Sequence, residues 1–550
     1  MQLKTSGSSA LIASAFLLPG VVLLAYGWSL FNSPAFGSLA DQSYHLALAQ
    51  EYTRALQAGE FPPRWAAGLN GGRGAPTFIV YPPLFSMLTA GLSSLTDSPR
   101  NALRAAVLVS ALGGFWAVFY LARSKLSVTR ALIAGALALL LPGPTMLALG
   151  RGMYPNFAAL VWVALAAGAA QRLLGDRSVR ANQAVLVLAL SGLLLTHALT
   201  AFMAGILLLA ALPFLLYRVE RRVLPRYCEA VLLAMFITAW YWIPLLEASS
   251  DLRLEYLTRG HPYLESTLWG AAPDATAYEQ NWTVLNLVGK GMVIAQSILS
   301  LFVFFALKDA ALAGNAGRSA ATPDSSPRPP WVFLDLLPWI AGFALLAAID
   351  PVARLLVELP RFSMVQFSWR WQLFVSLWCA VGLASLPRRP LSFAAAALGA
   401  VVLLFFSPLL SSVERLPASS TALSAEISKD DLDALDPSVR AAYGANAIEL
   451  RPIGSDSAYY LPAPYGQVSV LAGQAVVNST TLQPGRRLYT VEAASPSTLR
   501  FVTYHCPGWR ALLDDAEHPI TAESETGLQL IDVPTGPHRL ELSYEVRWGW

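Results

Sequence analysis

Asp41 and His45 are the first residues of the chain whose types and spacing suggest chemistry. They lie four positions apart in a polar segment that begins at Ser38, shortly after an apolar run over 10–31. If 38–58 is helical, both side chains lie on one face of the helix at a membrane surface. A carboxylate in that position can accept a proton or stabilise positive charge. The alternative is structural, because the Ser-Leu-Ala-Asp sequence can also begin a helix with Asp41 as its cap.

The composition indicates an integral membrane protein. Of 550 residues, 55% are hydrophobic and only 13% are charged, whereas a soluble protein carries about 25% charged residues. The net charge of +3 is too small to favour a nucleic-acid partner. We read the first apolar run as a retained signal anchor, which leaves the N-terminus in the cytoplasm.

Apolar runs long enough to cross a bilayer recur along the first 410 residues. They predict about eleven transmembrane helices, over 10–31, 101–121, 131–149, 155–171, 182–197, 198–217, 228–246, 284–307, 331–348, 371–386 and 391–410. Basic residues favour the cytoplasmic side of a membrane. The predicted topology places most short basic loops there, with Lys4, Arg123, Lys125, Arg130, Arg172, Arg177, Arg180, Arg218, Arg221, Arg222, Arg226, Arg388 and Arg389.

A further apolar run over 78–95 is interrupted by Pro82 and Pro83. Consecutive prolines break a helix, because each ring removes a backbone donor and clashes with the preceding turn. If 78–95 crossed the membrane, the first basic loops would lie outside. We therefore predict a helix at the outer surface, within one large outer loop over 32–100.

The last part of the chain has a different pattern. Segments such as 467–477, 499–505, 528–534 and 538–546 alternate apolar and polar residues and are separated by turn residues. This period of two predicts antiparallel strands. The fold class is therefore a mainly α polytopic membrane domain over 1–410 with a C-terminal extracytoplasmic β-sandwich over 411–550. A Gly/Ser/Pro-rich linker is expected over 308–330.

Several arginines lie on the predicted outer side, although basic residues usually favour the cytoplasmic side. The set comprises Arg64, Arg73, Arg151, Arg253, Arg259, Arg361 and Arg370. The guanidinium fork donates two hydrogen bonds at once, which suits phosphate. Arg370 lies between Trp369 and Trp371, so the alternative there is an interfacial aromatic belt with a snorkelling cation.

Several short motifs follow one another along the chain in an order that suggests a known family. The outer loop contains "GEFPPRW" (59–65), "NGGRGAP" (70–76) and "YPPL" (81–84), and "LLTHALTA" (194–201) and "VQFSWRW" (365–371) follow. With "YHCPGWRALLDD" in the tail, this pattern resembles the GT-C superfamily of polytopic glycosyltransferases. Within it, the chain is most similar to bacterial membrane proteins labelled 6-pyruvoyl-tetrahydropterin synthase-related, although nothing in the sequence points to pterin chemistry.

The resemblance implies a polyprenyl-phosphate-linked sugar donor and an acceptor that is a glycan, a lipid or a protein. It implies a multi-pass protein of the bacterial inner membrane, in contact with membrane lipids. Asp41 is then the catalytic carboxylate, which stabilises an oxocarbenium-like transition state or takes the acceptor proton. The candidate substrate-binding residues are His45, Arg64, Arg73, Tyr81, Arg151, His197, Arg361 and Arg370.

Alternatives stay open for several of these residues. His45 either orients Asp41 or contacts phosphate, or it is a polar residue on a solvated face. His197 is a functional residue between two apolar runs, or it supplies one hydrogen bond to a tight turn. Related transferases often carry an Asp-Glu pair at the loop start, where this chain has Asp41-Gln42. A divalent cation is therefore an open alternative rather than an expectation.

Two other functions compete with glycosyl transfer. A transporter or flippase of lipid-linked glycans would show internal repeats and helices broken near the bilayer midplane. The sequence instead concentrates polar residues at the outer surface. A non-catalytic glycan-assembly protein would depend on the β-domain alone.

Overall fold

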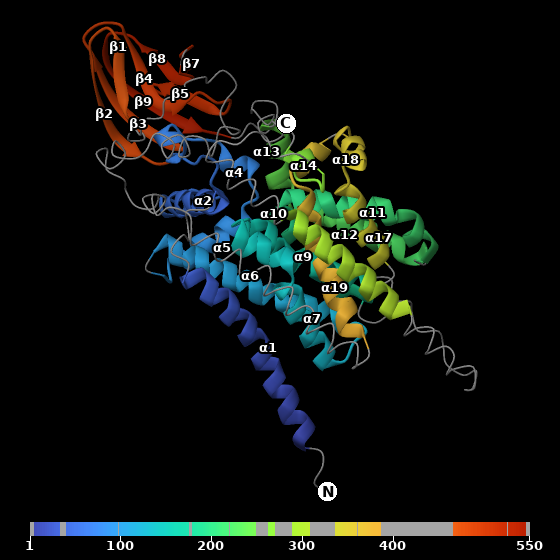
Figure 1. Cartoon of the computed structure of the whole chain (residues 1–550). Coiled ribbons are helices and arrows are strands. Elements are labelled where there is room, and N and C mark those ends of the chain that lie inside the picture. The colour runs from blue at the N-terminus through green and yellow to red at the C-terminus, as the bar shows by residue number, and fades with distance from the viewer. Residues whose placement is uncertain are drawn as a thin grey trace, which may run out of the picture. The chain divides into compact units, whose positions relative to one another are not determined.

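The computed structural model describes residues 5–32, 40–96, 98–174, 179–218, 221–248, 262–269, 289–308, 336–359, 361–386, 466–524 and 526–545 (Figure 1). The chain forms two compact units. The first comprises Met1–Phe36, Ala106–Thr238 and Thr258–Leu416, and the second comprises Gly37–Ala105, Ala239–Leu257 and Pro417–Trp550. Residues 37–105, which include most of the predicted outer loop, thus belong to the same unit as the C-terminal domain. The predicted division of the chain into 1–410 and 411–550 places this loop in the N-terminal domain.

The first unit is helical. Its elements are α1 (Thr5–Asn32), α7 (Val128–Leu140), α8 (Pro142–Thr145), η1 (Met146–Gly150), α9 (Tyr154–Leu173), α10 (Val179–Thr196), α11 (Ala198–Arg218), η2 (Arg221–Val223), α12 (Leu224–Ile237), α14 (Pro262–Glu265), α17 (Leu337–Ala347), α18 (Asp350–Val357), η4 (Phe362–Val365), η5 (Ser368–Trp371) and α19 (Gln372–Ser385). A further helix runs over Gly289–Lys308. Helix α6 (Pro99–Ala122) begins in the second unit and continues into the first.

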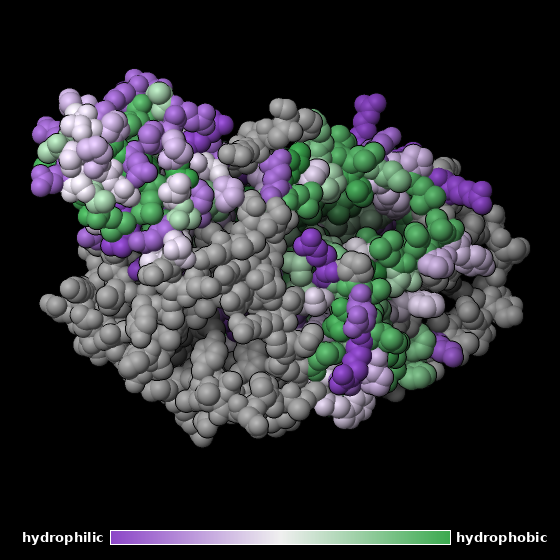
Figure 2. Space-filling model, turned by 90° about the horizontal axis from the view of Figure 1, so that it is seen from above, coloured by the Kyte–Doolittle hydropathy of each residue, from purple (hydrophilic) through white to green (hydrophobic). Residues whose placement is uncertain are grey.

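Five of the described helices are long and apolar enough to cross a membrane, and counting two bent helix pairs as single spans raises this number to seven. Many large apolar side chains on them are exposed, as Leu24, Leu188 and Phe236 illustrate. Figure 2 shows hydrophobic side chains gathered over the helices. These features indicate a multi-pass membrane protein. The predicted number of eleven spans stays a prediction, since α17 and α19 are shorter and 391–410 and the linker lie outside the described residues.

The Pro82–Pro83 break predicted for 78–95 is confirmed. Helix α4 (Thr77–Val80) ends before the two prolines and α5 (Leu84–Ser93) begins after them. Ten residues of α-helix rise about 15 Å, which is half of the hydrocarbon thickness that a span must cross. Helix α5 is therefore too short to cross a bilayer by itself.

The second unit also contains α2 (Ala40–Gln57), α3 (Leu69–Gly72), α13 (Ala239–Ala248) and two antiparallel sheets. The sheets have the orders β1-β4-β8-β7 and β2-β3-β9-β5-β6. Their strands are β1 (Val468–Ala472), β2 (Ala475–Leu482), β3 (Arg486–Ala493), β4 (Ser497–Tyr504), β5 (Trp509–Leu513), β6 (Ala516–His518), β7 (Thr521–Ala522), β8 (Leu528–Val533) and β9 (Gly536–Tyr544). The alternating segments of the sequence thus form strands, as predicted.

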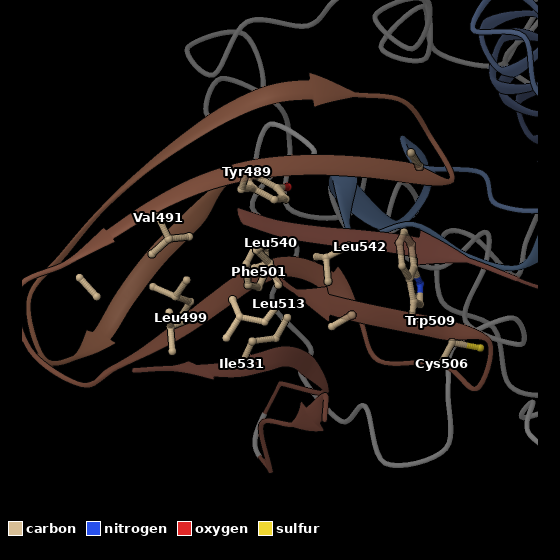
Figure 3. Packing of buried hydrophobic residues seen from close by; sticks show 14 of the residues in the cluster. Tyr489, Val491, Leu499, Phe501, Cys506, Trp509, Leu513, Ile531, Leu540 and Leu542 are labelled. Carbon is tan, nitrogen blue, oxygen red and sulfur yellow. The ribbon is translucent and has the colours of Figure 1, made fainter. Parts of the chain in front are cut away.

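Both sheets contribute to one apolar core. Leu499 and Phe501 on β4 face Leu540 and Leu542 on β9 across this core (Figure 3). Two buried members come from far away in the sequence, because Trp65 and Ala67 of the 32–100 loop belong to the same cluster. The sandwich is therefore completed by a segment from the N-terminal part of the chain.

The membrane topology can be tested by cysteine labelling. Phe61 and Thr480 are exposed residues on the predicted outer side, and Lys125 and Arg221 are exposed residues on the predicted inner side. In a Cys228→Ser background, an impermeant maleimide should label cysteines at 61 and 480 in intact cells and spare those at 125 and 221. Labelling at 125 but not at 61 would reverse the predicted orientation of the loop.

Candidate functional site

Two of the predicted phosphate-binding arginines meet on one pair of aromatic rings. The rings of Phe367 and Trp369 are stacked, with centroids 4.9 Å apart and planes inclined by 11°. The Arg151 guanidinium carbon lies 4.9 Å from the Trp369 centroid and 5.5 Å from the Phe367 centroid. The Arg370 guanidinium carbon lies 5.1 Å from the Phe367 centroid. We call these four residues the arginine–aromatic cluster.

Irregular backbone positions both arginines. Helix α7 and the segment Pro142–Gly150 bend by 44° relative to each other, and Arg151 follows the π-helical turn η1 that ends this segment. Arg370 lies in η5, where Ser368 donates its hydroxyl to the Ser266 carbonyl at 2.6 Å. Single π-helical turns occur frequently at functional sites, because the extra residue redirects the side chains that follow.

The cluster is buried. Arg151 and Arg370 are each only 7% exposed, and Trp369 and Trp371 are almost fully enclosed. An interfacial belt with a snorkelling cation requires exposed rings and a charge in water, so this alternative for Arg370 does not fit the structure. Arg370 donates to the Val365 carbonyl at 3.0 Å. Two guanidinium groups on one aromatic pair repel each other, and an anionic oxygen bound by both would relieve that repulsion.

Asp41, His45 and Tyr81 lie in the second unit, on and beside α2. The helix begins at Ala40, so Asp41 lies within its first turn and His45 follows one turn later, as expected. The His45 ring contacts Tyr81 edge-on at 5.7 Å and Phe85 at 6.3 Å. The position of Asp41 also suits a purely structural role, because a carboxylate in the first turn interacts favourably with the helix dipole.

His45 is buried rather than solvated. Only 5% of the residue is exposed, which excludes the alternative of a polar residue on a wet face. Burial lowers the pKa of His45 to about 3. The imidazole is therefore neutral at physiological pH, and it can hydrogen-bond to a substrate or to Asp41 but adds no positive charge.

The "NGGRGAP" loop shows why glycines are needed there. Gly74 has φ +80°, and a Cβ on it would lie 2.3 Å from the Nε1 atom of Trp65. Backbone hydrogen bonds between Ala66 and Ala75 close the loop, at 2.9 and 3.1 Å. Glycine supplies both the left-handed backbone and the close approach.

Replacing Gly74 with alanine should destabilise the protein. A Cβ at this position collides with a fully buried indole and also strains the backbone, which together cost about 2 kcal/mol or more. Thermal unfolding of the full chain measures this loss. Gly91→Ala is the matched control, because nothing lies within 4 Å of its Cβ position in α5. A Gly74→Ala variant as stable as Gly91→Ala would contradict the packing described for Trp65.

Arg64 and Arg73 lie near the same loop. Arg64 is half-buried and donates to the Trp240 carbonyl at 3.4 Å, and burial lowers its pKa. The Arg73 side chain donates to the Asn70 carbonyl at 3.3 Å. Both contacts are to backbone oxygens, so these arginines hold the loop in place, and their role toward a substrate stays a prediction.

His197 lies at the junction of α10 and α11. Its Nδ1 atom is 2.7 Å from the Thr200 hydroxyl and accepts from the Thr200 backbone N–H at 3.2 Å. Asn156 donates to the same hydroxyl at 2.7 Å. This chain of hydrogen bonds supports the turn-capping alternative directly.

Arg361 is the remaining predicted residue. It is exposed, and with φ +65° it precedes η4 in a left-handed conformation. The residues that sequence reasoning missed are Phe367 and Trp369, whose stacked rings support both buried arginines. Their spacing in "VQFSWRW" was visible, but an i,i+2 aromatic pair does not by itself indicate a ligand.

The described residues do not favour a metal at Asp41. Within the part of the chain that the structure describes, no three His, Cys, Asp or Glu side chains form a group that could hold a metal ion. Gln42, which follows Asp41 directly, is buried at 3% exposure and is not a carboxylate. A single carboxylate is a poor ligand set for a divalent cation.

Comparison with known proteins finds similarity to solved structures but not to known sequences. No family model and no curated protein sequence matches the chain. It is similar to the archaeal oligosaccharyltransferase AglB from Archaeoglobus fulgidus in complex with an inhibitory peptide and a dolichol-phosphate, with 14% identity and a TM-score of 0.38, over 80% of this chain. It is also similar to ArnT from Cupriavidus metallidurans, in the apo state and bound to undecaprenyl phosphate. For these two structures the identity is 14% and the TM-score 0.29, over 70% and 67% of this chain and 78% and 77% of those chains. The chain spans about 60% of the length of the archaeal oligosaccharyltransferase.

Proposed function

We propose that the chain is a GT-C-type glycosyltransferase that moves a sugar from a polyprenyl-phosphate donor to a glycan, lipid or protein acceptor at the extracytoplasmic membrane face. The observation that carries this proposal is the arginine–aromatic cluster. Two buried guanidinium groups on one aromatic pair, in a unit built from apolar helices, suit a lipid whose only charge is a phosphate.

The reaction breaks the bond between the anomeric carbon and the phosphate oxygen. The phosphate leaves with the bonding electrons, and Arg151 and Arg370 hold its charge. The acceptor hydroxyl forms the new bond to the anomeric carbon and gives its proton to Asp41. The same carboxylate stabilises the positive charge that develops on the sugar ring. In this proposal neutral His45 and Tyr81 bind the donor, as do His197, Arg64, Arg73 and Arg361.

One observation favours the competing transport function. The bend between α7 and Pro142–Gly150, which ends at Arg151, is the kind of interrupted helix that transporters use at their binding sites. Such a helix would present the same arginines to a lipid phosphate that is moved rather than cleaved.

A transfer assay separates the two functions. The purified full chain is reconstituted into liposomes that contain polyprenyl-phosphate sugars labelled in the sugar, with acceptor candidates in solution. Transfer yields labelled acceptor and free polyprenyl phosphate. Exchange of intact donor between leaflets, with no polyprenyl phosphate released, would replace the transferase proposal by the transport function.

A further inference from the structure

Helix α2 ends in a well-defined cap. Gly59 has φ +82° and donates to Leu56 O at 3.0 Å, and Glu60 donates its backbone N–H to Ala55 O at 2.9 Å. This arrangement is a Schellman motif, which satisfies some of the carbonyls that a helix leaves unpaired at its end. It brings Ala58 and Glu60 to a fixed position at the end of the helix that carries Asp41.

The turn between β2 and β3 meets this cap. We call Gln483–Arg486 the hairpin tip, because reciprocal backbone bonds between Gln483 and Arg486 close a two-residue turn. The Gln483 side chain donates to the Ala58 carbonyl at 3.0 Å. The Gly485 backbone N–H donates to the Glu60 carboxylate at 2.6 Å. The hairpin tip therefore binds the Ala58 carbonyl and the Glu60 carboxylate at the C-terminal end of α2.

The residue that directly follows the hairpin tip, Arg487, carries a buried positive charge. Arg487 is fully buried, donates to the Thr503 hydroxyl, and places its guanidinium carbon 5.1 Å from the Trp509 ring centroid. Burial raises the pKa of Glu60, whereas the Gly485 N–H bond and the positive charge of Arg487 favour its ionised form. Arg487 therefore adds a positive charge that favours the ionised form of the Glu60 carboxylate, which accepts the hydrogen bond from the Gly485 N–H of the hairpin tip.

Three further contacts join the 32–100 loop to the sandwich. The Trp65 ring packs 5.2 Å from Trp509 and 4.9 Å from Tyr544 between centroids. The Tyr504 backbone N–H donates to the Arg73 carbonyl at 2.9 Å. The loop is therefore bound to the β-sandwich both by its apolar core and by polar contacts.

We propose that Glu60 and Arg487 are positioning residues, through which the β2–β3 hairpin fixes the C-terminal end of α2 and thereby the orientation of the helix that carries Asp41. An 18-residue helix is about 27 Å long and nearly rigid, so a change at Ala58 is transmitted to Asp41. The sandwich is then part of the machinery that orients the carboxylate rather than an appended binding module. This inference does not depend on which reaction Asp41 takes part in.

Hydrogen exchange on the full chain in nanodiscs tests this role, with peptides over α2 and over β2–β3 followed by mass spectrometry. Glutamine has nearly the shape of glutamate, and Glu60 is only half-buried. The fold should therefore survive the Glu60→Gln substitution. The substitution removes the negative charge that accepts the Gly485 N–H and that Arg487 favours. The exchange rate of amides in the last two turns of α2 should therefore rise about tenfold. Arg487→Met should have the same effect, and Arg487→Lys, which keeps the charge, should restore most of the protection.

The matched control is Arg486→Met. Arg486 is adjacent in sequence but its side chain is 61% exposed and paired with Glu541 at 2.7 Å, so its loss should leave α2 unchanged. The proposal is overturned if Glu60→Gln leaves α2 exchange unchanged, or if Arg486→Met raises it equally. If Arg487→Met does not fold, Glu60→Gln decides alone. Since exchange needs neither donor nor acceptor, failure here is distinguishable from failure of the transferase proposal.

Discussion

Replacing Asp41 with asparagine should reduce turnover by a factor of about 10²–10⁴ while leaving the protein folded. Asparagine has nearly the same shape but cannot accept a proton or stabilise an oxocarbenium-like charge, and general acid–base assistance contributes a factor of this size. The interaction of a first-turn carboxylate with the helix dipole is worth only about 0.3–1 kcal/mol. Transfer rate and thermal stability are measured on the same preparation.

Asp350→Asn is the control for this prediction. Asp350 lies in the first turn of α18 and pairs with Arg354 at 2.8 Å, so its loss also removes a carboxylate from a helix start. This variant should lose a little stability and keep its turnover. Full activity of Asp41→Asn would exclude Asp41 as the base, and a joint loss of activity and stability would make Asp41 a structural residue.

Removing either arginine of the arginine–aromatic cluster should weaken binding of polyprenyl phosphate by roughly 10- to 100-fold, the range for losing a hydrogen bond to a charged group. Arg370→Ala should weaken binding more than Arg370→Lys, since lysine keeps the charge but loses the fork. If both arginines hold one phosphate, as proposed, the effects of Arg151→Ala and Arg370→Ala should not add in the double variant. The Kd of polyprenyl phosphate for the detergent-solubilised chain gives the measurement.

Arg354→Ala serves as the matched control, because its side chain is 67% exposed and it pairs with a carboxylate. Its Kd should equal that of the unmodified chain. Equally small effects of Arg370→Ala and Arg370→Lys would leave Arg370 as a structural residue that holds the Val365 carbonyl.

Local features of the fold were predictable from the sequence. The i,i+4 spacing of Asp41 and His45, the break at Pro82–Pro83 and the alternating strands each depend on a few consecutive residues. Such patterns are governed by backbone geometry and by local burial, which short segments encode. Helices α1, α6, α9 and α10 were equally predictable, since a long apolar run has few other stable structures in a membrane protein.

Long-range features were not predictable in this way. Arg370 lies within 4.0 Å of Met153 although 217 residues separate them, and no local pattern encodes that approach. The burial of His45 by Tyr81 and Phe85 depends on how the segment after Pro83 folds back on α2. In the sequence Arg151 and Arg370 are therefore separate candidates, and only the structure shows them on one pair of rings.

The position of Trp65 has a consequence for biogenesis. The sandwich that encloses this indole is made from the last part of the chain, and contacts such as Gln483 to Ala58 span 425 residues. During synthesis the outer loop therefore emerges long before its partner strands exist. Its apolar side chains must stay uncovered while every intervening helix is inserted, which makes the nascent loop a candidate client for chaperones. Truncations near the C-terminus should thus be recognised by quality-control proteases through the N-terminal loop, far in sequence from the deletion itself.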